Sequence, residues 1–68
     1  MKRQEIVQQQ AGREIELLSR LHIIYGLKDE PCFAAQKKKI VDLITDGNIN
    51  VKRDLDPLSV NLYRRYFG

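Results

Sequence analysis

The chain has 68 residues, with twelve Lys and Arg against nine Asp and Glu, one cysteine and one histidine. A chain of this length forms one small domain, and a single cysteine and a single histidine exclude both an intrachain disulfide and a closed zinc site. The formal charge of +3 permits an anionic partner without requiring one, and the hydrophobic content of 43% argues against a disordered chain.

The segment from residue 2 to about residue 25 is predicted to form one long helix. It contains no proline and is rich in Gln, Glu, Leu and Ile. Gly26 follows it, at the position where helices commonly place a left-handed residue. At 100° per residue the segment has one apolar stripe with a second row beside it. The stripe contains Val7, Ala11, Ile15, Leu18, His22 and Tyr25, and the second row contains Ile6, Leu17, Leu21 and Ile24.

Residues 31–46 are predicted to form a second helix. Asp29 and Glu30 precede Pro31, and a proline at the first helical position loses only an N–H that has no partner within the helix. Gly47 follows the segment and is expected to cap its end. The apolar stripe of this helix consists of Phe33, Ile40, Leu43 and Ile44.

Residues 47–55 are predicted to form an extended connector. Ile49 and Val51 alternate with polar residues as in a short strand, but the chain has no second strand to pair with it. We therefore expect Ile49, Val51 and Leu55 to point inward and fill one end of the core.

A third helix is predicted over residues 57–67. Asp56 followed by Pro57 repeats the signal of a cap and then a proline. Leu58, Leu62 and Tyr66 then recur every four residues, so they lie on one face of the predicted helix.

These segments predict a single all-α domain over residues 1–68, in which a long N-terminal helix packs on two shorter helices. No internal repeat or linker divides the chain. The predicted core contains Leu17, Leu18, Leu21, Ile24, Phe33, Ile40, Ile44, Leu58, Leu62 and Tyr66.

The sequence indicates no catalysis, so we expect no catalytic residue, no cofactor and no metal. His22 stands between Leu21 and Ile23, which is typical of a histidine at the edge of a core. Cys32 has no orienting motif and no glycine-rich oxyanion loop to accompany it. Four glycines in all leave no loop that could cradle a phosphate.

A cytoplasmic location is the expectation for this chain. No apolar stretch after Lys2 and Arg3 has the form of a signal peptide. No run of residues approaches the roughly 18 apolar positions that a membrane helix needs.

The leading functional hypothesis is a non-catalytic regulator or adaptor that binds a protein partner. The apolar arc of the first helix spans about half its circumference, which is more than one neighbouring helix covers. We therefore expect part of this arc to bind a partner chain or a second copy of the protein in a homodimer. The candidate interface residues are Val7, Ala11, Leu17, Leu21 and Ile24.

The alternative hypothesis is a basic nucleic-acid-binding protein. In that case phosphates would be contacted by Lys37, Lys38, Lys52, Arg53, Arg64 and Arg65, with Lys2 and Arg3 in addition. Successive residues of a helix point about 100° apart, however, so Lys37, Lys38 and Lys39 alone cannot form one contiguous patch.

Overall fold

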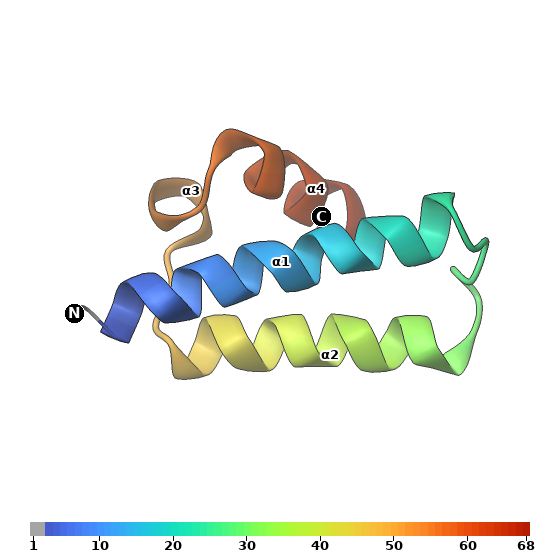
Figure 1. Ribbon diagram of the computed structural model, residues 1–68, viewed down its shortest axis with the longest axis horizontal. Coiled ribbons are helices and arrows are strands. Elements are labelled where there is room, and N and C mark those ends of the chain that lie inside the picture. The colour runs from blue at the N-terminus through green and yellow to red at the C-terminus, as the bar shows by residue number, and fades with distance from the viewer. Residues whose placement is uncertain (1–2) are drawn as a thin grey trace.

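The computed structural model describes residues 3–68 and contains, within that range, four helices and no strand. The helices are α1 (Arg3–Ile23), α2 (Pro31–Asp46), α3 (Val51–Asp54) and α4 (Pro57–Phe67). Helices α1 and α2 run antiparallel side by side, and α4 packs against another side of α1 (Figure 1). The predicted all-α fold with a long first helix and two shorter ones is confirmed.

The chain ends α1 and begins α2 and α4 where the sequence predicts. The backbone N–H of Ile24 still donates to the carbonyl of Arg20 at 2.9 Å, and Gly26 then adopts a φ of +64°. That left-handed conformation is costly for residues with a Cβ, which explains why a glycine stands there. Pro31 and Pro57 are the first residues of α2 and α4, and each follows a residue with extended backbone.

Helix α2 ends in a Schellman motif, and its left-handed residue is Asn48 rather than the glycine before it. The N–H of Ile49 donates to the carbonyl of Ile44 at 3.0 Å, and the N–H of Asn48 donates to that of Thr45 at 3.2 Å. Asn48 has a φ of 51°, whereas Gly47 keeps a φ of −83°. Ile49 is then buried beside Ile44, the apolar contact that usually accompanies this motif.

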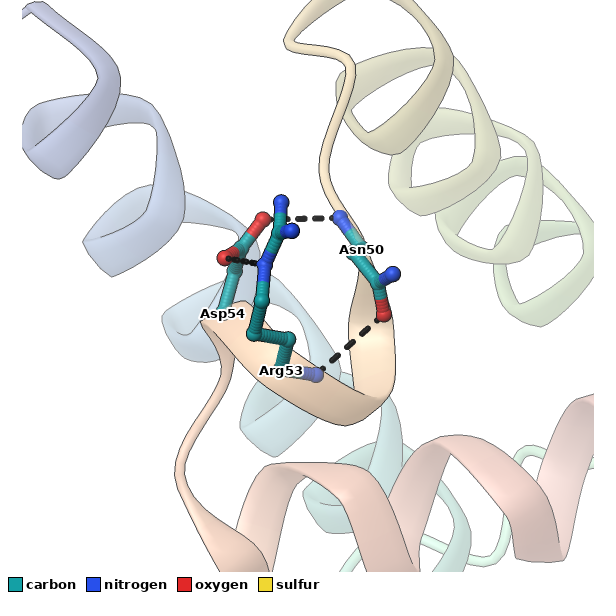
Figure 2. Close-up of polar contacts among 3 residues, drawn as sticks. All are labelled: Asn50, Arg53 and Asp54. Carbon is teal, nitrogen blue, oxygen red and sulfur yellow. Dashed lines mark hydrogen bonds and ion pairs between the residues drawn. The ribbon is translucent and has the colours of Figure 1, made fainter.

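The prediction that residues 47–55 are extended throughout is wrong, because α3 forms one helical turn within them (Figure 2). The side chain of Asn50 accepts a hydrogen bond from the N–H of Arg53 at 3.2 Å. In return, Asp54 Oδ2 accepts one from the N–H of Asn50 at 2.8 Å. Two polar side chains thus satisfy backbone donors that an extended segment would expose to solvent.

The core is small and lies where α1, α2 and the segment around α3 meet. Its buried apolar residues are Ala11, Ile15, Leu18, Phe33, Ile40, Ile49 and Leu55. Ile49 and Leu55 point inward as predicted, and Val51 is half-buried against the same cluster. The predicted core residues Leu18, Phe33 and Ile40 are confirmed, while Leu21, Ile44, Leu62 and Tyr66 are partly buried around the core.

Three residues of the predicted core are exposed instead. The exposed fractions are 40% for Leu17, 65% for Ile24 and 62% for Leu58. Leu17 and Ile24 lie on a side of α1 that no other helix covers fully. Leu58 is exposed because α4 turns Ser59 toward α1 instead: Ser59 is buried, and its Oγ lies 3.4 Å from where a Cβ on Gly12 would stand.

Candidate functional site

Part of the apolar surface that the fold leaves uncovered is a row of three side chains on one side of α1, named here the α1 flank and consisting of Ile6, Leu17 and Ile24. The other large apolar side chains that are exposed are Ile23, Tyr25, Val41 and Leu58. Spacings of eleven and seven residues keep these three positions within about 20° of one another around a helix axis. Ile24 stands one residue beyond α1, but its hydrogen bond to Arg20 continues the helical path. Ile6 is 50% exposed, so all three residues present a large apolar side chain to solvent.

Polar contacts between α1 and α2 border the α1 flank. The Nε2 of Gln36 donates to Glu14 Oε1 at 2.8 Å and to the carbonyl of Glu14 at 2.9 Å. Lys39 Nζ lies 3.3 Å from the same Oε1. These contacts cross from α2 to α1 and fix α2 beside the flank. An apolar row bordered by polar side chains has the organisation of many protein interfaces.

The five candidate interface residues fall into two groups. Ala11 is fully buried, and Val7 and Leu21 pack partly against the core, so these three support the fold of the single chain. Leu17 and Ile24 remain exposed and belong to the α1 flank. The sequence-based list omitted Ile6, although its spacing from Leu17 and Ile24 was a signal that could have identified it.

The six candidate nucleic-acid contacts do not gather on one surface. Lys37 and Arg65 meet at a hollow near the end of α1, where they are joined by Lys28, which the sequence did not single out. Lys52 and Arg53 belong to α3, which lies beside the N-terminal half of α1 (Figure 1). Lys38 and Arg64 are exposed and are not among the residues that line this hollow. Lys2 and the side chain of Arg3 lie outside the described residues.

One of these basic residues, Arg53, forms an ion pair with a neighbouring residue. Arg53 Nε donates to Asp54 Oδ1 at 3.1 Å, within the capping arrangement of α3 (Figure 2). The N–H of Asn50 and the guanidinium of Arg53 both favour the ionised carboxylate and hold the pKa of Asp54 below its ordinary value. Arg53 therefore stabilises α3 and is only partly available to an external phosphate.

The only histidine forms part of an aromatic cluster. His22 Nδ1 and the hydroxyl of Tyr66 are hydrogen-bonded at 2.7 Å, and the ring of Phe33 packs edge-on against both. Cys32 is exposed on α2. Within residues 3–68, no group of three His, Cys, Asp or Glu side chains is placed to hold a metal ion. His22 thus ties α1 to α4, which accounts for its place on the apolar side of α1.

Comparison of the chain with models of protein families, with curated proteins and with solved structures found no match. None of the described helices combines the length and the apolar character that crossing a membrane requires. The functional argument therefore depends on the chain's own surface.

Proposed function

We propose that this protein is a non-catalytic binding module, acting as a regulator or adaptor, whose α1 flank packs against an apolar helix of another protein chain. A second copy of the same protein is the partner that the chain itself supplies. The single observation that supports the proposal is the α1 flank: a small core leaves Ile6, Leu17 and Ile24 from 40% to 65% exposed in one row.

The length of the flank suits a helix as its partner. From Ile6 to Ile24 the axial rise is about 27 Å at 1.5 Å per residue. A partner helix lying along α1 can therefore contact all three side chains at once. The polar border formed by Glu14, Gln36 and Lys39 limits the width of the contact on the α2 side.

The magnitude of the apolar burial sets the expected affinity. Burying a whole Leu or Ile side chain contributes roughly 1.5–3 kcal/mol, so three side chains that are about half exposed contribute about 3 kcal/mol per chain. Two copies contribute about 6 kcal/mol, against an association cost of at least about 4 kcal/mol. The difference of about 2 kcal/mol corresponds to weak self-association with a Kd of about 30 mM, while a partner with a larger apolar surface binds more tightly.

The test compares charged variants of exposed apolar positions by sedimentation equilibrium. Leu17→Glu and Ile24→Glu place a carboxylate in the flank and should abolish self-association while leaving the helical circular dichroism spectrum unchanged. Leu58→Glu is the matched control for Ile24→Glu, because Leu58 is 62% exposed against 65% for Ile24 but lies on α4. Equal loss of association in all three variants would count against the flank, and unfolding of Leu17→Glu would show that this side chain belongs to the core.

The nucleic-acid hypothesis stays the alternative proposal, and the separation of its candidate residues makes it the weaker one. If it holds, affinity for a DNA or RNA duplex should fall steeply with salt concentration, with a slope set by the number of phosphates contacted. Absence of binding at low salt would exclude it.

A further inference from the structure

A second feature of the surface is a basic hollow at the end of the molecule where α1 finishes. Its side chains come from α1, the turn before α2, α2 itself and α4, and it has a volume of about 620 Å³. Three of them are cations and three carry rings: Lys28, Lys37 and Arg65, with His22, Phe33 and Tyr66. Ile23 completes the lining, so none of the described carboxylates lines the hollow.

The aromatic wall of the basic hollow is held in place by contacts between three helices. The rings of His22 and Tyr66 meet edge to face with centroids 5.5 Å apart, and those of Phe33 and Tyr66 meet similarly at 5.8 Å. The hydrogen bond of 2.7 Å between His22 and Tyr66 adds a polar link. The wall is therefore formed before any ligand arrives, which lowers the entropic cost of binding.

The three cations of the hollow have no acidic partner among the described residues. The ion pairs among residues 3–68 join Arg20 to Glu16, Lys39 to Glu14 and Arg53 to Asp54. Lys28, Lys37 and Arg65 take part in none of them. Three like charges around one hollow repel one another, and an anion placed between them removes that repulsion.

Lys37 lines the hollow, and its ammonium group also packs over an aromatic ring just outside the lining. Its Nζ lies 5.2 Å from the centroid of the Phe67 ring, which itself stacks on the ring of Tyr63 at 4.6 Å. A cation held over an aromatic face keeps its remaining N–H donors free for an anion. Arg65 provides a planar guanidinium that can bind two oxygens of the same anion at once.

The charge of its lining distinguishes the basic hollow from a second hollow, which lies between α1 and α4. That second hollow is lined by Arg13 but also by Glu16, Asp54 and Asp56, so acidic groups predominate there. The basic hollow is thus where cations gather without acids.

We propose that the basic hollow binds the phosphate group of a small phosphorylated molecule. A phosphate dianion has several oxygens to accept hydrogen bonds from the three cations, which a single carboxylate matches less well. The hollow lies within the size range of pockets for small ligands, so the organic part of the ligand can lie against the rings of Phe33 and Tyr66. This site is independent of the α1 flank.

The test is an NMR titration at low salt, with inorganic phosphate as one probe and adenosine monophosphate as the other. Amide shifts should change at Ile23, Lys28, Phe33 and Arg65, and the monophosphate should bind more tightly than phosphate because its base adds contact with the aromatic wall. Shifts spread over all the basic residues of the chain would overturn the proposal.

Two pairs of adjacent residues give matched variants of equal net charge. Lys37→Gln and Arg65→Gln remove cations that line the hollow, whereas Lys38→Gln and Arg64→Gln remove exposed cations beside them. Lys37→Gln and Arg65→Gln should each weaken binding about three- to tenfold, and the two control variants should leave the affinity unchanged. Equal weakening by all four would show attraction to net charge only.

A short single-stranded oligonucleotide is the third probe. Binding of the oligonucleotide together with no binding of phosphate or monophosphate would overturn the small-molecule proposal and would indicate nucleic acid as the ligand. Binding of the monophosphate with the expected variant pattern would support it.

Discussion

Replacing Gly47 by alanine tests how the start of α1 is anchored to the end of α2. A Cβ at this position would stand 2.5 Å from Cγ1 of Val7 and 2.9 Å from the carbonyl oxygen of Leu43. Ordinary contacts between carbon atoms lie at about 3.5–4.0 Å, so Val7 must shift, and the contact with the carbonyl oxygen is also too short for a Cβ to fit without movement. Val7 has little freedom to move away because a β-branched side chain in a helix strongly prefers one rotamer.

The expected cost follows from these contacts. Overpacking of this kind typically destabilises by about 1–3 kcal/mol, and the smaller entropy of the unfolded chain returns up to about 1 kcal/mol when glycine becomes alanine. We expect a net loss of about 1–2 kcal/mol in the free energy of unfolding by urea, or roughly 5–15 °C in Tm for a domain of this size.

A double-mutant cycle with Val7→Ala identifies the cause. If the clash with Val7 dominates, Gly47→Ala should cost at least about 1 kcal/mol less in the Val7→Ala background. A neutral or stabilising Gly47→Ala in the unmodified protein would refute the close packing of α1 on the end of α2.

Three further changes test other parts of the fold. Ile15→Ala removes a fully buried side chain and should cost about 2–5 kcal/mol, whereas Leu58→Ala at an exposed site should cost less than about 0.5 kcal/mol; urea unfolding measures both. Gly26→Ala should cost about 1–2 kcal/mol through its φ of +64° alone, since no atom lies within 4 Å of the added Cβ. Asp54→Asn should lower stability at neutral pH. Because the folded-state pKa of Asp54 is lowered, its contribution is present above the ordinary Asp pKa of about 3.9 and is lost as the pH falls through the folded value. Urea unfolding should therefore show the two proteins converging toward pH 2, and a constant difference would contradict this account.

The ends of the long helices could be predicted from local chemistry. Pro31 and Pro57 begin helices and Gly26 has positive φ, because each of these residues restricts or permits the backbone irrespective of what packs on it. The turn of α3 was missed because it depends on a reciprocal pair of side-chain caps, Asn50 and Asp54, which a strand-like alternation of Ile49 and its neighbours concealed.

The distribution of apolar residues between core and surface was harder to predict. The wide arc of α1 indicated that more than one element packs on it, but periodicity alone does not show which part of an arc a neighbour covers. Helix α4 turns Ser59 toward α1 and leaves Leu58 in solvent, and neither α2 nor α4 covers Leu17 and Ile24 fully. The expectation of a surplus apolar surface on α1 fits these exposures, although its members were only partly identified.

The basic hollow could not be predicted, because its residues are far apart in the sequence. His22 and Tyr66 are separated by 44 residues, yet their side chains are hydrogen-bonded. Lys28 stands alone in a turn and gives no pattern by itself. Only the packing of α4 across the end of α1 brings Lys28, Lys37 and Arg65 to one place.

The central claim, that the α1 flank binds another chain, is tested most directly by sedimentation equilibrium of the unmodified protein at concentrations from about 0.1 mM to about 10 mM. With a Kd of about 30 mM, the weight-average mass should rise from that of one chain at the lowest concentration to about 1.3 chains at the highest. A mass that stays at one chain throughout would contradict the claim that Ile6, Leu17 and Ile24 form a self-associating surface.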